Sequence, residues 1–338
     1  MAQKLLSARQ YIDGVLQGDR IVLARAITVI ESERPADAGL SAEILEGLLP
    51  PSGRARRIGI TGVPGGGKST LIDALGMHLI RERHQKLAVL SVDPSSPLSQ
   101  GSILGDKTRM ARLSAEENAF IRPSPARGHL GGVARRTRET MLLCEAAGYE
   151  NIFVETVGVG QSETAVRAMT DFFLLILVTG AGDELQGIKR GILEMIDCIA
   201  INKADNGNEQ KAERARAEYA NALHLFPASS SGWTPRAITI SALTGKGIAE
   251  LWETILEHRA QLDLAELRSR QALDWMRELV TTGLQGLFSA DPGIQARLPD
   301  LERAVQTGAL TPAAAARELL VYFAPNLFHD QSLPGRQT

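Results

Sequence analysis

The chain has 338 residues, and its 37 lysines and arginines nearly balance its 39 aspartates and glutamates. A chain of this length can bury a sizeable core in one large domain with helical additions or in two modest domains. The charge balance, with no basic block, argues against a general role on nucleic acid or on a membrane surface. We therefore expect a specific partner.

Cysteine content and hydropathy predict a cytoplasmic protein. Cys144 and Cys198 lie in separate apolar stretches without the spacing of a metal site, which indicates buried thiols in a reducing compartment. No apolar run reaches the roughly 20 residues that a membrane-spanning helix requires. The amino terminus also lacks the apolar core and the cleavage site of a signal peptide.

Residues 1–50 predict a helical extension. Behind a cap at Asp19, apolar residues recur at helical spacing at Ile21, Leu23, Ala24, Ile27 and Ile30. Pro35 is expected to end this helix, and Ser41 to cap a second, short one. The loop 50–53 contains two prolines and a glycine and separates the extension from the next region.

Residues 51–258 predict an α/β domain with a doubly wound, mostly parallel sheet, because short apolar runs alternate with glycine or polar turns and with helical stretches. The expected strands are 58–61, 87–92, 152–154, 172–178, 198–201 and 237–240. Helices are expected over 71–83 and 209–225. Ligands of such a sheet bind at the carboxyl ends of its strands.

Residues 259–338 predict a helical arm. An apolar stripe indicates a long helix that stops before Asp291 and Pro292; its members are Leu273, Met276, Val280, Leu284 and Leu287. Thr311 and Pro312 are typical of the start of a later helix. The stripe must cover the sheet or pair with another chain, and its periodicity does not decide between these outcomes.

The strongest motif is Gly62-Val63-Pro64-Gly65-Gly66-Gly67-Lys68-Ser69, between the first expected strand and a helix that begins near Thr70. This is the context of a phosphate loop, so the domain is predicted to be a P-loop NTPase. Its glycines let backbone N–H groups turn toward phosphates. Lys68 would reach the terminal phosphates, and the Ser69 hydroxyl would bind magnesium.

A second motif, Asn202-Lys203-Ala204-Asp205, follows the expected strand 198–201 and predicts recognition of guanine. An aspartate there can accept hydrogen bonds from N1 and from the exocyclic amine of guanine, whereas adenine offers no matching pair of donors. Ser241-Ala242-Leu243 is typical of the loop that closes over the base.

Three carboxylates are candidates for a magnesium site. Asp93 follows strand 87–92, Glu155 follows strand 152–154, and Asp106 lies in the loop 101–110. Mg²⁺ on phosphates keeps several waters and one or two protein oxygens, so these acids and Ser69 suffice for its inner and outer shells. Which acids touch the ion directly is left open. Lys68, Asp93 and Glu155 are the candidate catalytic residues.

Glu155-Thr156-Val157-Gly158 stands where many GTPases carry Asp-x-x-Gly, which places the Gly158 amide to sense the γ-phosphate. Val159 follows where Ras-like proteins have a water-orienting glutamine, so slow hydrolysis by the isolated chain is expected. The glycine-rich loops 93–106 and 180–191 are predicted switching elements. The missing group could come from several side chains, none singled out by the sequence: Gln161, Gln186, Lys189, Arg109, Arg135 and Arg136.

With these motifs in place, the chain resembles the ArgK/MeaB family of GTPases, which are chaperones of adenosylcobalamin-dependent methylmalonyl-CoA mutase and related acyl-CoA mutases. The resemblance covers nearly the whole chain and rests on residues 62–70, 91–97, 101–110, 122–125, 131–134 and 155–163. Two departures from the family pattern are Gly66, where valine or alanine is common, and Gln100, where a second glycine is common. Both could alter loop flexibility.

The resemblance implies a homodimer held by the C-terminal arm and a GTP-gated interaction that protects the mutase and admits the correct cobalamin, which belongs to the partner. It implies that phosphate and magnesium are bound by Lys68, Ser69, Asp93, Asp106 and Glu155. Guanine would be bound by Asn202, Lys203 and Asp205. A loop containing Gln186 and Lys189 would couple the nucleotide state to the partner.

Two other functions are compatible with a phosphate loop, namely a P-loop kinase and a nickel-insertion-type GTPase. A kinase needs a phosphoacceptor site and usually ATP, and the guanine motif argues against it. Nickel-insertion GTPases tend to carry histidine-rich or paired-cysteine metal sites, which this sequence lacks. A binding module without catalysis is disfavoured because Lys68, Ser69 and the acids are all present.

Overall fold

The computed structural model describes residues 5–49, 53–92, 110–123, 130–156, 162–179, 190–224 and 232–325. The chain forms two compact units, Met1–Leu267 and Arg268–Thr338. The three-part division at residues 50 and 258 remains a prediction. Among the described residues, no helix combines the length and the apolar character needed to cross a bilayer.

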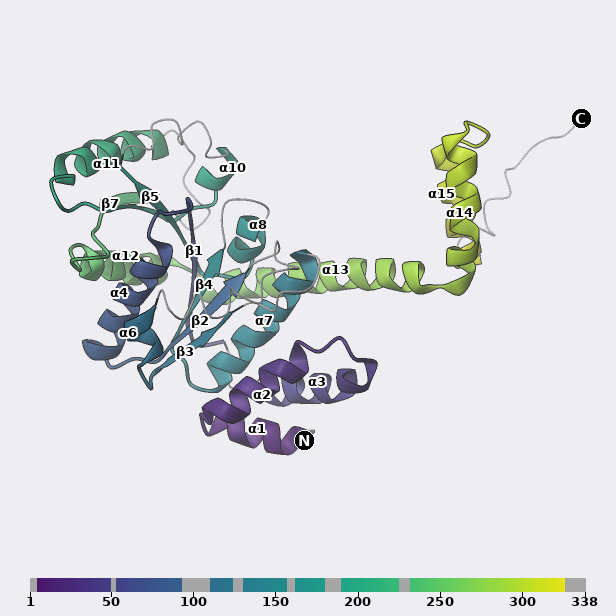
Figure 1. Ribbon diagram of the computed structural model, residues 1–338, viewed down its shortest axis with the longest axis horizontal. Helices are drawn as coiled ribbons and strands as arrows, with labels where there is room; N and C mark the ends of the chain where they lie inside the picture. The colour runs from purple at the N-terminus through teal and green to yellow at the C-terminus, as the bar shows by residue number, and fades with distance from the viewer. Residues whose placement is uncertain are drawn as a thin grey trace, which may run out of the picture. The chain divides into compact units, whose positions relative to one another are not determined.

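Among its described residues, the first unit is built on a parallel sheet of seven strands in the order β3-β2-β4-β1-β5-β6-β7 (Figure 1). Its strands are β1 Arg56–Gly62, β2 Leu87–Val92, β3 Ala119–Arg122, β4 Asn151–Thr156, β5 Phe172–Val178, β6 Cys198–Asn202 and β7 Arg236–Thr239. β1 lies between β4 and β5, so the loop after β1 leaves the sheet where the strand order changes direction. That is the ligand position of doubly wound sheets.

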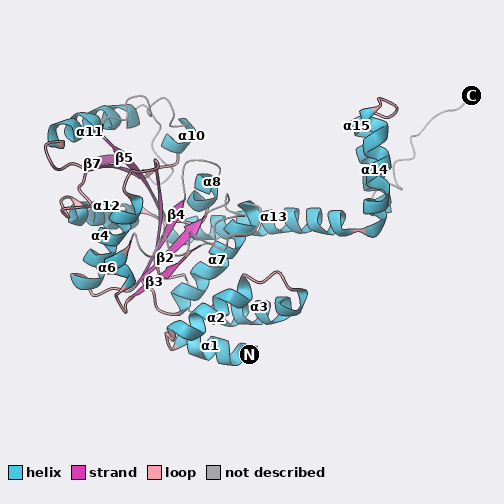
Figure 2. Ribbon diagram, in the orientation of Figure 1, coloured by secondary structure: helices cyan, strands magenta, loops and turns pink. Residues whose placement is uncertain are grey.

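The side chains of alternate strand residues point into two separate hydrophobic cores, one on each face of the sheet. On β5, Phe172 and Leu174 point into one core, while Phe173 and Leu175 point into the other. The first core is covered by α4 Lys68–Arg81, α6 Ala111–Ser114 and α12 Ile248–Gln261. The second is covered by α7 Leu130–Ala146, α8 Ser162–Arg167, α10 Arg190–Leu193 and α11 Glu209–Leu223 (Figure 2). The predicted doubly wound P-loop fold is confirmed.

Three N-terminal helices extend the second core: α1 Ala8–Leu16, α2 Arg20–Ile30 and α3 Pro35–Leu48. They lie beside α7 (Figure 1). The predicted cap is confirmed, because the Asp19 carboxylate accepts hydrogen bonds from the backbone N–H groups of Ile21 and Val22. An ion pair between Arg122 of β3 and Glu31, together with one between Arg136 of α7 and Glu33, ties these helices to the sheet unit.

Two expectations at this end of the chain were wrong. Pro35 begins α3 at its first turn, where the missing N–H of proline is no loss, and Ser41 lies inside that helix without capping one.

Strand β3 was not predicted from the sequence. It has four residues, and two of them are only half-buried, so its apolar run is too short to stand out.

The second unit contains most of α13 Leu264–Ala290, together with α14 Pro292–Gln306 and α15 Pro312–Phe323. The predicted end of the long helix before Asp291 and the predicted start of a later helix at Thr311 are confirmed. α13 ends at Ala290, Asp291 caps α14, and Thr311 caps α15. Phe288 packs edge-on against Phe323 with ring centroids 5.2 Å apart. The side chains of the apolar stripe on α13 are about half exposed or more, at 48 to 66%.

Candidate nucleotide-binding site

The phosphate loop lies between β1 and α4 and is fixed at its root by β5. A Cβ atom on Gly62 would lie 2.3 Å from the carbonyl oxygen of Ile176, so only glycine fits there. The backbone then turns, with the Gly66 N–H donating to the Val63 carbonyl at 3.0 Å. Gly67 precedes the first turn of α4 in a left-handed conformation with φ of 88°. The N–H groups of that first turn have no partner within the helix and are suited to an anion.

Lys68 is held at the loop by the loop's own carbonyl groups. Its Nζ donates to the carbonyl oxygens of Gly62 at 2.8 Å and Val63 at 3.2 Å. Ser69 stands beside it on the first turn of α4 and is half-buried. An ammonium group and a hydroxyl are therefore placed where the motif predicts contacts with phosphates and magnesium.

Asn202 joins the phosphate loop to Ser241-Ala242-Leu243, the predicted loop over the base, which we name the base-recognition loop. Its Nδ2 donates to the Gly66 carbonyl at 2.9 Å, and its Oδ1 accepts from the Ala242 N–H at 3.0 Å. The side chain is buried at the end of β6. The two loops are thus connected through one amide, although they are far apart in the sequence.

A second contact joins Ser241 of the base-recognition loop to Asp205 of the other guanine motif. The Ser241 hydroxyl donates to Asp205 Oδ2, and the Thr244 N–H donates to the Ser241 oxygen at 3.1 Å. Lys203 is exposed, with a left-handed φ of 62°. Leu243 is 73% exposed, which leaves an apolar side chain available to a flat base. The structure therefore brings both guanine motifs to one side of the phosphate loop.

Substitution of Gly67 should weaken nucleotide binding through Asn202. A Cβ at this position would lie 2.5 Å from Asn202 Nδ2, and the backbone conformation is unfavourable for alanine. We expect Gly67→Ala to lower GDP affinity at least about tenfold, measured by calorimetry.

Gly65→Ala is the matched control for this prediction. Gly65 also has a left-handed φ, of 75°, but a Cβ there would meet no atom of the described residues within 4 Å. The Gly65→Ala variant should therefore strain the backbone without a collision with Asn202. Equal losses of affinity in the two variants would contradict a role for the Asn202 contact.

Glu155 is the one predicted metal-site acid among the described residues. It is buried near the end of β4, opposite Ile60 of β1 on one side and Ser91 of β2 on the other. Its carboxylate and the Ser69 hydroxyl are both oxygen donors, the type that Mg²⁺ prefers. The remaining predicted residues lie outside the described part of the chain: Asp93, Asp106, Gly158, Gln186 and Lys189.

Other candidates are placed in structural contacts. Arg135 pairs with Glu139 on α7 at 2.9 Å, and Arg136 pairs with Glu33 at 2.7 Å. Burial raises the pKa of Glu139, and this effect exceeds the opposing influence of Arg135.

Cys144 and Cys198 are free and fully buried, and burial raises the pKa of both thiols. Within the described residues, no group of three or more His, Cys, Asp or Glu side chains is arranged to hold a metal.

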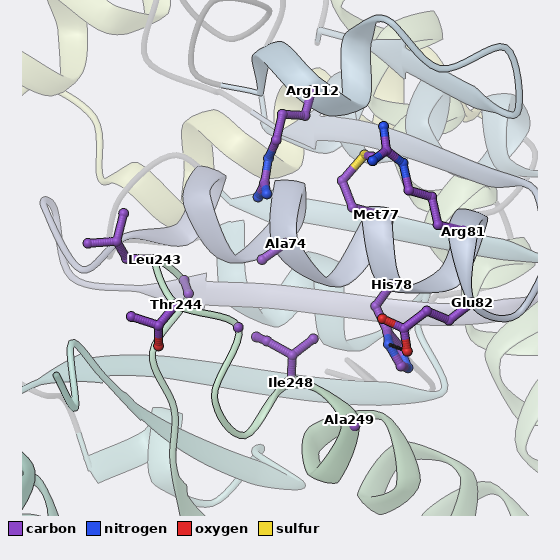
Figure 3. A pocket seen from close by; sticks show the side chains of 12 residues that line it. Ala74, Met77, His78, Arg81, Glu82, Arg112, Leu243, Thr244, Ile248 and Ala249 are labelled. Carbon is purple, nitrogen blue, oxygen red and sulfur yellow. Dashed lines mark ion pairs between the residues drawn. The ribbon is translucent and has the colours of Figure 1, made fainter.

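A cavity of about 310 Å³ lies beside the base-recognition loop, between α4, α6 and the start of α12 (Figure 3). Leu243 and Thr244 form one edge of it, and Arg112 projects toward it from α6 (Figure 3). The guanidinium of Arg112 is bound through Nε to Asp73 at 2.6 Å. Of the predicted nucleotide-binding residues, Ala242 and Leu243 line this cavity, whereas the phosphate loop, Asn202 and Asp205 do not.

Comparison with known proteins gives consistent matches over most of the chain. Residues 23–292 match a family model described as methylmalonyl Co-A mutase-associated GTPase MeaB. A putative GTPase of Caulobacter vibrioides is 51% identical over 313 residues, covering 91% of this chain and 95% of the relative. A mitochondrial methylmalonic aciduria type A homolog of Mus musculus is 45% identical over 324 residues, covering 92% and 78%. The crystal structure of a LAO/AO transport system kinase gives a TM-score of 0.76 at 37% identity, covering 95% of this chain and 99% of that one.

Proposed function

The chain belongs to the MeaB family of methylmalonyl-CoA mutase-associated GTPases and is itself a GTPase, and from this premise we propose that it is the G-protein chaperone of an adenosylcobalamin-dependent acyl-CoA mutase. In this proposal its nucleotide state gates the loading and protection of the cobalamin of the partner, in the cytoplasm. The observation that supports it most is the family match over residues 23–292, which extends past the phosphate loop and both guanine motifs.

The nucleotide chemistry is assigned to residues of the first unit. The first turn of α4 and Lys68 would hold the phosphates, while Asn202, Lys203 and Asp205 would hold guanine. Ser69 and Glu155, with Asp93 and Asp106, would hold Mg²⁺, which when bound neutralises charge on the phosphates. Hydrolysis that persisted unchanged with excess EDTA would contradict the magnesium assignment.

Coupling to the partner and dimer formation are assigned to residues outside the nucleotide site. Gln186 and Lys189 are assigned to the contact between nucleotide state and partner. The exposed apolar stripe on α13 supports a homodimer, because a soluble helix seldom leaves such a row of side chains in water unless it is covered. Light scattering that gave the mass of one chain, 36.4 kDa, at micromolar concentration would contradict the dimer.

A P-loop kinase is the alternative, since one relative of solved structure is named a transport system kinase. The connected contacts around Asn202 and Asp205 favour guanine over adenine and so favour the GTPase. Phosphate release from GTP compared with ATP separates the two functions. Preferential release from ATP, with transfer to an acceptor, would favour the kinase.

The proposed partner is tested by measuring GTP hydrolysis with a panel of purified acyl-CoA mutases. Because Val159 stands where a water-orienting glutamine is common, we expect slow intrinsic turnover that one mutase accelerates at least about tenfold. The Lys68→Ala variant, with the same mutase, controls for contaminating phosphatase. A rate that no mutase in the panel changes would contradict the chaperone function while leaving GTP hydrolysis intact.

A further inference from the structure

Two buried threonine hydroxyls meet at the root of the phosphate loop. The Thr156 hydroxyl donates to Thr61 Oγ1 at 2.8 Å, and both side chains are fully buried. β1 and β4 are parallel neighbours in which Ile60 lies opposite Glu155, so the two threonines follow at the next position of each strand. The contact therefore joins the ends of the two strands that lead into the site.

Each threonine is adjacent in the sequence to a residue with a predicted role, one in the phosphate loop and one in the magnesium site. Thr61 directly precedes Gly62, whose carbonyl oxygen holds Lys68 Nζ at 2.8 Å. Thr156 directly follows Glu155, the described acid of the predicted magnesium site. On its other side, Gly62 is packed against the Ile176 carbonyl of β5. The phosphate loop is thus fixed to β5 by packing and to β4 by the hydroxyl pair.

Packing alone does not require hydroxyl groups at these positions. The neighbouring strand residues Ile60, Val154 and Ile176 are apolar and fully buried, and valine would fill the same volume as threonine. A buried hydroxyl needs a hydrogen-bond partner to offset its loss of water. A hydrogen bond also has a narrow range of distance and angle, whereas apolar contact tolerates small shifts between strands.

We propose that Thr61 and Thr156 are positioning residues for GTP hydrolysis, because their contact sets the placement of the Glu155 carboxylate relative to the phosphate loop. This inference rests on the proposed role of Glu155. Binding of GDP depends on the guanine motifs and on the phosphate loop, which the packing of Gly62 against β5 still holds when the hydroxyl contact is lost. Loss of the hydroxyl contact therefore acts on the hydrolytic step and spares nucleotide affinity.

The test compares Thr156→Val, Thr61→Val, the double variant and Thr156→Ser in the full chain. Single-turnover hydrolysis should fall about tenfold in each valine variant, with GDP affinity by calorimetry within about threefold of wild type. Thr156→Ser keeps the hydroxyl and should recover most of the rate. Because the residues act as a pair, the double variant should be no slower than either single one.

Thr254→Val is the matched control, since Thr254 is also buried and its hydroxyl donates to the Glu250 carbonyl at 2.9 Å on α12. It should lose thermal stability as the others do while keeping the hydrolysis rate. Unchanged hydrolysis in folded Thr61→Val or Thr156→Val, additive losses in the double variant, or a loss that Thr156→Ser does not recover would each overturn the inference. Should Thr156→Val fail to fold, Thr61→Val, which removes only the acceptor, decides the question.

The proposed role of Glu155 is tested separately with Glu155→Gln. If this variant hydrolyses GTP at the wild-type rate while Thr156→Val does not, Glu155 is not the group being positioned. If both variants are as fast as wild type, positioning by the threonine pair is also excluded. Slow hydrolysis in both, with intact GDP binding, is the expected result.

Discussion

A Lys68→Ala variant is expected to hydrolyse GTP at least about 100-fold more slowly than the wild-type chain. The ammonium group would neutralise charge on the terminal phosphates, and removal of one such preorganised donor typically costs this much in rate. Its described hydrogen bonds to the carbonyl oxygens of Gly62 and Val63 are local to the phosphate loop, and we expect the melting temperature to change by only a few degrees. Single-turnover hydrolysis and thermal unfolding measure the two effects.

Lys86→Ala provides the control for removal of a lysine. Lys86 is exposed and directly precedes β2, at the sheet edge opposite the phosphate loop, so the variant should hydrolyse GTP like the wild type. Hydrolysis that remained within about threefold of wild type in Lys68→Ala would mean that the loop does not bind the reacting phosphates.

Replacement of Asp205 should change which base the site prefers. With Asp205→Asn, we expect GTP affinity to fall at least about 100-fold, since the paired acceptors for N1 and the exocyclic amine are lost. Xanthosine triphosphate carries a carbonyl in place of that amine, and its affinity should rise because the new amide can donate to it. Competition titrations of the two nucleotides on the same variant give the ratio directly.

Asp13→Asn is the matching control, because Asp13 is an exposed carboxylate on α1 that pairs only at 3.8 Å with Arg9. Base preference should be unaffected by that change. Wild-type affinity for GTP in Asp205→Asn would show that the base is recognised elsewhere. The Ser241 hydroxyl donates to Asp205 and can also donate to the amide oxygen of the Asp205→Asn side chain. The base-recognition loop should therefore stay in place in this variant, and a loss of GTP affinity would not come from loss of that loop.

The strands that carry the site could be predicted because parallel strands are buried on both faces. The run 172–178 is continuously apolar for that reason, and 87–92 is apolar except for Ser91; glycine or a polar residue follows where the chain reaches the ligand edge. The phosphate loop was likewise predictable, since its glycines and Lys68 are adjacent in the sequence. The roles of the predicted site residues stay predictions, which the variants above test.

Other features depend on contacts between distant segments and could not be predicted. The role of Asn202 as a connection between Gly66 and Ala242 exists only after β1 and β6 are placed in one sheet. The hydroxyl pair of Thr61 and Thr156 has the same origin, since it depends on the register of β1 and β4. Pro35 was misassigned because proline both ends helices and occupies their first turn.

The most direct test is a calorimetric titration of the purified chain with GDP and, in parallel, with ADP, both with magnesium. One assembled site, formed by the loop around Lys68 and the contacts of Asn202 and Asp205, predicts saturable binding of GDP and at least about 100-fold weaker binding of ADP. Absence of heat with GDP, or equal affinities for the two nucleotides, would contradict it.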